Sequence, residues 1–136
     1  MASRLNPYLN FQNNAREAIE FYREVFGGEL NVMTFGDMGG EPADGVMHAQ
    51  LETPLGFTLM ASDAPPGETV APGGSMHISL SGDDTEELTG YFRALAEGGV
   101  VVDDLQVQAW GDTFGMLVDR FGIGWLVNIA GEGNAG

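Results

Sequence analysis

Two segments of the chain carry the hydrophobic spacing of an amphipathic helix, and a pair of glycines closes each of them. In residues 13–30 apolar side chains recur every three or four positions, and Asn14 with Glu17 three residues later has the pattern of a capping box. Gly27 and Gly28 then supply the left-handed backbone that commonly ends a helix. The apolar face consists of Ala18, Ile19, Tyr22, Val25 and Phe26.

A second segment, residues 82–102, repeats this pattern. Asp84 is its candidate cap, and Gly98 with Gly99 ends the predicted helix. The apolar face consists of Leu88, Phe92, Leu95 and Ala96. Because Gly27 corresponds to Gly98 in this comparison, the chain has an internal repeat of about half its length.

Alternation of apolar and polar positions predicts short strands around both helices. In the first half they lie at residues 7–12, 29–36, 46–52 and 57–61, and the second half repeats this order. A loop rich in glycine and acidic residues at 37–45 is a candidate flexible lid. Each half therefore has the order strand, helix and three strands.

A linker rich in proline and glycine at residues 62–75 joins halves of about residues 5–61 and 76–130. Near their ends, the segment that begins at Gly56 matches the one that begins at Gly124. The sequence predicts an α+β fold of tandem βαβββ repeats in which residues 1–136 form a single domain. The side chains expected to be mostly buried are Leu9, Phe11, Ile19, Tyr22, Val25, Phe26, Ile78, Leu80, Leu88, Phe92, Leu95, Val118 and Trp125.

The charge of the chain excludes several classes of partner. The sequence contains twenty acidic residues, five arginines and no lysine, which gives a net charge of −15. We expect no nucleic acid and no anionic membrane as partner, because both require basic surfaces. No apolar segment approaches the roughly 20 residues that span a membrane, the N-terminus lacks the apolar core of a signal peptide, and cysteine is absent. We therefore expect a cytoplasmic protein.

Several segments resemble one known family. PYLNF at residues 7–11, EAIEFYREVFGGEL at 17–30 and WGDTFGMLVDRFGIGWLVN at 110–128 are similar to the PhnB-like branch of the vicinal oxygen chelate superfamily. This superfamily also contains glyoxalase I, the bleomycin and fosfomycin resistance proteins and the extradiol dioxygenases. The resemblance extends from Pro7 to Asn128 and implies a curved mixed sheet around a cleft, a small-molecule ligand and a homodimer. Some members are labelled demethylubiquinone methyltransferases, but no glycine-rich cofactor loop follows a strand here.

Metal-dependent members of this superfamily hold their metal with four ligands, two from each half, on the first and last strands. By this resemblance His77 is the first-strand ligand of the second half, and Asn6 or Pro7 stands at the same place in the first half. The last-strand positions carry apolar residues, near Leu59 or Met60 and near Leu126. Since a transition metal needs three or more N, O or S donors, we expect no cofactor and no shared metal centre.

The two histidines offer one way to replace the lost ligands. His48 lies on a predicted strand whose opposite face is apolar, so its side chain can face the cleft as a ligand-binding residue. Together with His77, and with Asp63 or Glu52, it could bind a divalent metal. The alternative is that each imidazole only makes hydrogen bonds as a neutral, partly buried group.

A second set of candidate ligand-binding residues lies near the C-terminus. Trp110 and Phe114 place two aromatic side chains in a loop, where they can stack on a flat ligand or instead cover one end of the sheet. Asn128 on the last strand is a further candidate, whereas Trp125 on the same strand is expected in the core.

Two functions are compatible with these residues. One is an enzyme of the lyase, isomerase or oxygen-transfer type, in which His77 acts on a small polar or aromatic metabolite as a base or as a remaining metal ligand. The other is a non-catalytic binder that sequesters a flat or cationic compound, as the bleomycin resistance proteins do, and the acidic surface favours a cation. The sequence leaves open whether the protein is an enzyme.

Overall fold

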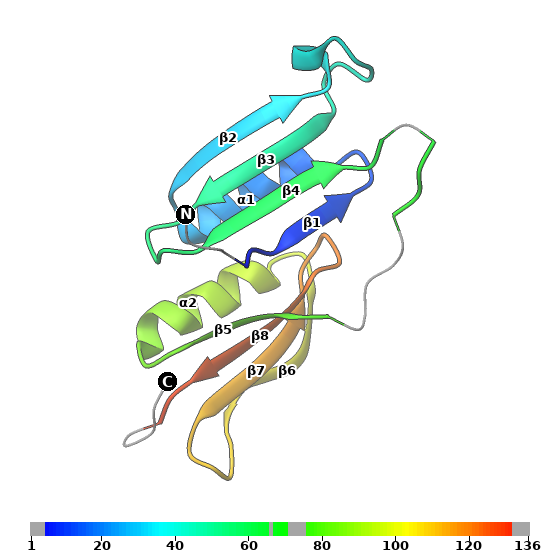
Figure 1. Cartoon of the computed structure of the whole chain (residues 1–136). Helices are drawn as coiled ribbons and strands as arrows, with labels where there is room; N and C mark the ends of the chain where they lie inside the picture. The colour runs from blue at the N-terminus through cyan, green and yellow to red at the C-terminus, as the bar shows by residue number, and fades with distance from the viewer. Residues whose placement is uncertain (1–4, 66, 71–75, 132–136) are drawn as a thin grey trace. The chain divides into compact units, whose positions relative to one another are not determined.

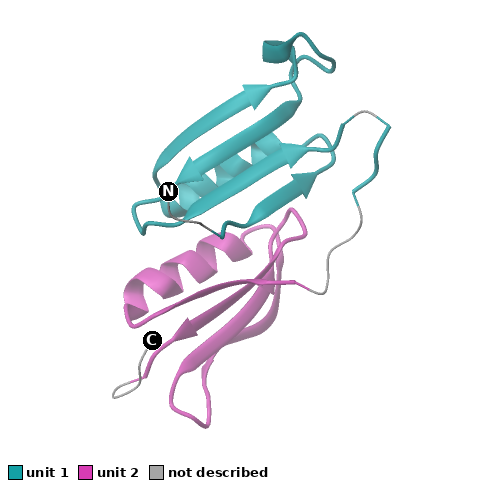
Figure 2. Ribbon diagram, viewed as in Figure 1, with its two compact units in different colours: residues 1–71 teal, residues 72–136 magenta. Residues whose placement is uncertain are grey.

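The fold divides into two units that have the same order of elements. The computed structural model describes residues 5–65, 67–70 and 76–131. Residues 1–71 form the first unit and residues 72–136 the second (Figure 2). Within the described residues, each unit has one α-helix and one four-stranded mixed sheet, so the predicted α+β class and the tandem βαβββ repeat are confirmed.

In the first unit, α1 lies against one face of the sheet (Figure 1). The strand order is β1-β4-β3-β2, with β1 parallel to β4 and the other neighbours antiparallel. A short 3-10 helix, η1, lies in the loop predicted as a lid. The elements are β1 (Tyr8–Phe11), α1 (Ala15–Phe26), β2 (Glu29–Thr34), η1 (Gly36–Met38), β3 (Val46–Glu52) and β4 (Thr58–Asp63).

The second unit repeats this arrangement with α2 against its own sheet. The strand order is β5-β8-β7-β6, with β5 parallel to β8. The elements are β5 (Ile78–Gly82), α2 (Thr85–Ala96), β6 (Val100–Val107), β7 (Thr113–Val118) and β8 (Gly124–Ile129). In the part of the chain that the structure describes, no helix is long and apolar enough to cross a membrane.

The predicted linker at residues 62–75 begins too early, because β4 continues to Asp63. This extension follows from the pairing of Phe11 with Asp63, which adds the last rung of the parallel β1–β4 ladder. Residues 66 and 71–75 of the linker lie outside the described residues. The organisation of the halves as a single domain stays a prediction.

Most of the predicted core is buried, and one error in it follows from strand alternation. Leu117 rather than Val118 is fully buried on β7, because the side chain of Val118 points away from α2. Val118 is half-buried, and so are Leu9, Val25 and Ile78. The confirmed core residues are Phe11, Ile19, Tyr22, Phe26, Leu80, Leu88, Phe92, Leu95 and Trp125.

The start of α1 differs from the prediction. The side chain of Asn14 makes no capping hydrogen bond. Instead the backbone N–H of Ala15 donates to Oδ1 of Asp63 at 2.9 Å, and the N–H of Val46 donates to Oδ2 at 2.9 Å. A buried carboxylate from β4 thus ties the helix to the start of β3, and a local capping box is not used. In α2 the predicted cap is confirmed, since Asp84 Oδ1 accepts from the N–H of Glu87.

The glycine pairs that follow the helices serve a close backbone approach as well as a turn. Gly27 and Gly28 have φ values of +77° and +112°, as predicted for a helix exit. A Cβ atom on Gly28 would also overlap the carbonyl oxygen of Glu52 at the end of β3. Gly99 meets the carbonyl oxygen of Val118 in the same way, so the predicted repeat extends to these contacts.

The hairpins at the ends of the two units align differently from the prediction. The N–H of Gly56 donates to the carbonyl of Thr53, and the N–H of Gly122 donates to the carbonyl of Asp119. Gly56 therefore corresponds to Gly122, and the predicted match with Gly124 is wrong by two residues. The two hairpins have the same hydrogen bonds but different amino acids. A match of amino-acid identities therefore does not give their correct alignment.

The carboxylate of Asp63 gives a direct test of how the first unit is held together. We expect Asp63→Asn to destabilise the protein by about 1–3 kcal/mol, because the amide can accept only one of the two N–H bonds and turns an N–H group toward the other donor. The measurement is the free energy of unfolding in urea. Asp84→Asn is the matched control, because asparagine caps a helix as well as aspartate does. Equal effects of the two substitutions would contradict the proposed role of Asp63.

Candidate functional site

One face of each sheet is covered by a helix, and the opposite face carries the side chains that can meet a ligand. We call this second surface the helix-free face. In the first unit Ala49, Leu51 and Ala61 are buried beneath α1, so the alternate residues of the same strands point the other way. The side chains that define the helix-free face of the first sheet are Tyr8, His48, Gln50, Glu52 and Met60.

A row of hydrogen bonds crosses the helix-free face of the first sheet. Tyr8 Oη lies 3.1 Å from Nδ1 of His48, and Nε2 of His48 lies 3.4 Å from Oε1 of Gln50. Gln50 Nε2 donates to Glu52 Oε1 at 2.6 Å, and Thr58 Oγ1 donates to Glu52 Oε2 at 2.8 Å. We call these five residues the polar ladder. His48, predicted as a ligand-binding residue, is thus fixed within a network.

The helix-free face of the second sheet is more apolar. On β7 and β8, Phe114 pairs with Asn128, and Met116 pairs with Leu126. Asn128 Nδ2 donates to Oδ2 of Asp112 at 3.0 Å, which fixes the orientation of its amide. Together with His77, the residues Phe114, Met116, Leu126 and Asn128 define this face. The prediction of Phe114 in a loop is therefore wrong, because it lies on β7, where the structure brings it side by side with the predicted ligand-binding residue Asn128.

His77 is exposed, and its ring lies across a glycine. A Cβ atom added at Gly124 would lie 2.6 Å from Cδ2 of the imidazole, so only glycine leaves room for the ring there. Since Ile78 pairs with Trp125, His77 stands beside the start of β8, whereas Asn128 stands near its end. Because a strand advances by about 3.3 Å per residue, the length of β8 separates these two side chains. They lie on the same face but do not touch.

The remaining candidates lie elsewhere. Trp110 is 60% exposed in the turn between β6 and β7, where the N–H of Gly111 bonds the carbonyl of Gln108. Trp125 is fully buried as predicted, and its Nε1 donates to Oδ2 of Asp119 at 2.9 Å. His48 belongs to the first unit and the other predicted site residues belong to the second.

The residues present do not fit the metal site of the superfamily. In the corrected alignment of the two units, Met60 corresponds to Leu126. On the neighbouring parallel strands, Tyr8 lies beside Met60 and Ser79 lies beside Leu126. Tyr8 therefore corresponds to Ser79. Two residues earlier in each unit, Asn6, rather than Pro7, corresponds to His77. Neither last-strand position has an N or O donor.

The proposed replacement ligands are not assembled either. Both oxygens of Asp63 bond backbone N–H groups, and this side chain lies on the helix side of the sheet, opposite His48. Among residues 5–65, 67–70 and 76–131, no three His, Asp or Glu side chains are grouped as metal ligands. A metal-free protein stays a prediction.

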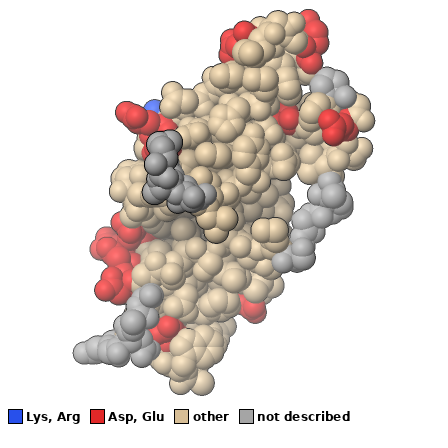
Figure 3. All heavy atoms as spheres, in the orientation of Figure 1, with Lys and Arg blue, Asp and Glu red and all other residues tan. Residues whose placement is uncertain are grey.

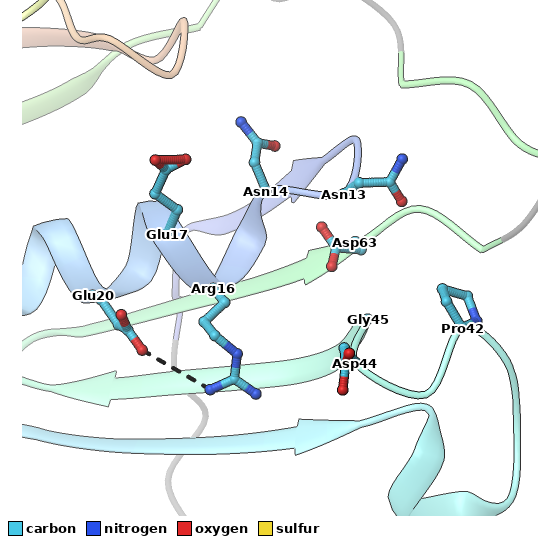
Figure 4. A pocket seen from close by; sticks show the side chains of 9 residues that line it. All are labelled: Asn13, Asn14, Arg16, Glu17, Glu20, Pro42, Asp44, Gly45 and Asp63. Atoms are coloured by element: carbon cyan, nitrogen blue, oxygen red, sulfur yellow. Dashed lines mark ion pairs between the residues drawn. The ribbon is translucent and has the colours of Figure 1, made fainter.

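A hollow of about 580 Å³ lies beside the start of α1 and is bordered by the loop predicted as a lid (Figure 4). Arg16 in it forms an ion pair with Glu20 at 3.9 Å, and Asp63 is bonded to the backbone as described. Arg16, Glu20 and Asp63 in this hollow thus have partners within the first unit. The hollow is lined by Asn13, Asn14, Arg16, Glu17, Glu20, Pro42, Asp44, Gly45 and Asp63.

The acidic side chains do not crowd the helix-free face of the first sheet. Figure 1 shows this sheet from the side opposite α1, and in the same view Figure 3 shows Asp and Glu mainly at the margins, among them those of the loop around η1. The large negative charge of the chain is therefore compatible with an uncharged ligand on this face.

Most of the polar ladder lies outside the site residues that the sequence predicts. Tyr8, Gln50 and Thr58 are not among them, and Glu52 is predicted only as a metal ligand. A signal for them exists, because His48, Gln50 and Glu52 place polar groups at every second position of a strand whose other face is buried.

Comparison with known proteins places the chain in a family. The model of the Glyoxalase/Bleomycin resistance protein/Dioxygenase superfamily matches residues 4–127, and the chain belongs to this superfamily. Protein YjdN of Escherichia coli (strain K12) is 29% identical over 140 residues, which cover 92% of this chain and 94% of YjdN.

Solved structures agree with this assignment. The crystal structure of protein PA1353 from Pseudomonas aeruginosa is 40% identical, with a TM-score of 0.85 over 94% of this chain and 98% of the other. A putative 3-demethylubiquinone-9 3-methyltransferase, PhnB protein, from Bacillus cereus is 25% identical, with a TM-score of 0.72 over 94% and 100% of the two chains. The predicted resemblance to the PhnB-like branch is confirmed.

The contact between His77 and Gly124 can be tested by one methyl group. We expect Gly124→Ala to push the imidazole away from β8, because the added Cβ would lie 2.6 Å from its Cδ2. The measurement is the nuclear Overhauser contact between the His77 ring and the α-protons of residue 124, which the substitution should remove. Gly90→Ala is the control, since nothing lies within 4 Å of a Cβ there. Absence of the contact in the parent protein would contradict this geometry.

Proposed function

We propose that the protein binds a small molecule on the helix-free face of the second sheet and acts on it through His77 as a general acid or base, without a metal. The observation that carries this proposal is the imidazole held across Gly124 at the edge of an apolar surface. Apolar and aromatic surfaces with a few polar groups are typical of small-molecule sites. Phe114, Met116 and Leu126 provide the apolar part, and Asn128 provides a hydrogen-bonding group.

The state of the imidazole supports a chemical role. His77 makes no hydrogen bond to another described residue, so its ring nitrogens can serve a ligand. A histidine changes charge near neutral pH and is the commonest general acid or base in enzymes. Proton transfer of this kind is the chemistry of a lyase or isomerase acting on a small polar or aromatic metabolite.

The second candidate is a non-catalytic protein that sequesters a flat or cationic compound. The exposed indole of Trp110 favours it, because an aromatic face gives a flat ligand a large contact area. We further propose a cytoplasmic homodimer without a nucleic-acid or membrane partner. The superfamily resemblance supports the dimer, and the net charge of −15 supports the absence of anionic partners.

The two candidate functions differ in which substitution matters. An unbiased thermal-shift screen can supply a ligand, because binding to the folded state raises its stability. If His77 is a base, we expect His77→Ala to bind this ligand almost normally and to lose about 10²–10⁴-fold in turnover. If the protein is a binder, Trp110→Ala should lose affinity and His77→Ala should not. Met76→Ala, at an exposed neighbouring position, is the control. Parental behaviour of both test variants would contradict both candidates.

The metal content of the protein tests the metal-free part of the proposal. We expect elemental analysis after mild purification to find no stoichiometric Zn, Ni, Mn or Fe, because the family's ligand positions hold one histidine and otherwise poor donors. One equivalent of any of these metals that is lost in His77→Ala would overturn this expectation.

A further inference from the structure

The carboxylate of Glu52 sets the direction of every hydrogen bond in the polar ladder. A carboxylate only accepts hydrogen bonds, so the group of Gln50 that faces Glu52 at 2.6 Å must be its NH₂. The amide oxygen of Gln50 therefore faces His48, and Nε2 of His48 must carry the proton in this contact.

The hydrogen bond on the other side of the ring then has only one possible direction. A neutral imidazole has one N–H group, and in His48 it lies on Nε2. Nδ1 is then an acceptor, and the hydroxyl of Tyr8 donates to it across 3.1 Å. The hydroxyl hydrogen of Tyr8 points to His48, so the hydroxyl oxygen of Tyr8 can accept a hydrogen bond from a ligand. The residue is 45% exposed, so a ligand can reach this oxygen.

We infer that Tyr8 and His48 form a proton-accepting pair on the helix-free face of the first sheet, and that the ligand there is a weakly acidic hydroxyl compound such as a phenol or an enol. Tyr8 is the catalytic residue, because its oxygen contacts the ligand. His48, Gln50 and Glu52 are positioning residues behind it. The inference concerns the first unit alone and does not depend on His77.

The proton transfer balances without a co-reactant. The ligand O–H gives its proton to Tyr8 Oη while the hydroxyl of Tyr8 gives its own proton to Nδ1 of His48. The ligand becomes an anion, Tyr8 is unchanged, and His48 becomes an imidazolium. The carboxylate of Glu52, two hydrogen bonds away, stabilises this cation through Gln50. Of the other titratable groups in the ladder, Tyr8 contacts His48 directly and Glu52 is linked to it through Gln50.

A sulfonyl fluoride that labels tyrosine tests the pair on the intact protein. The O–S bond forms, the S–F bond breaks, fluoride leaves, and the proton of Tyr8 passes to His48. We expect mass spectrometry to find Tyr8 labelled faster than Tyr91, whose pKa is raised by burial and by the charges of Glu87 and Asp84. His48→Gln keeps an acceptor but no base, and should slow labelling of Tyr8 by at least about tenfold. Asn10→Ala, on the same strand and outside the ladder, should not slow it.

The ligand class is tested by two probes that differ in one group. We expect phenol to protect Tyr8 from labelling, whereas anisole, which lacks the O–H, should not. Nitrogen NMR of the parent protein reports the tautomer of His48 without any substitution, and the proton should lie on Nε2. A proton on Nδ1, or labelling of Tyr8 that does not change in a folded His48→Gln variant, would overturn the pair. Equal protection by both probes, or by neither, would overturn the ligand class.

Discussion

The approach of each helix exit to the end of a neighbouring strand sets the register on which both sheets depend. Gly28 lies against the carbonyl of Glu52, and Gly99 lies against the carbonyl of Val118, so closely that a Cβ atom fits at neither place. A bulkier residue would separate β2 from β3, or β6 from β7, and a slip of one residue would turn every side chain to the opposite face. The separation of each sheet into a buried face and a helix-free face therefore rests on these glycines.

The two units share this register but are fastened by different carboxylates. In the first unit Asp63 accepts from the backbone N–H groups of Ala15 and Val46 and so joins α1, β3 and β4. In the second unit the residue that corresponds to Asp63 is the apolar Ile129, and a buried Asp119 instead holds the indole of Trp125. Buried acids, Asp63 in the first unit and Asp112 and Asp119 in the second, thus fix contacts that apolar packing alone would not direct, because hydrogen bonds have a required geometry.

Features that depend on local sequence could be predicted, and features that depend on distant partners could not. Both helices, their glycine exits and the cap at Asp84 follow from neighbouring residues. For α1 the local pattern predicts Asn14 as the cap, whereas the group that accepts from the first turn, Asp63, is far away in the sequence. In the same way, His48 could be named as a candidate from its strand, but its link to Tyr8 needs the placement of β1, β4 and β3 side by side.

The helix-free faces show how an acidic chain can present defined acceptors without presenting charge. Glu52 binds the NH₂ group of Gln50, and Asp112 binds the NH₂ group of Asn128. In each case the carboxylate accepts a hydrogen bond from the NH₂ group of an amide, and the amide oxygen faces away from it. Through His48 this polarity reaches the hydroxyl oxygen of Tyr8. The orientation of these acceptors thus comes from individual contacts and not from the net charge of −15.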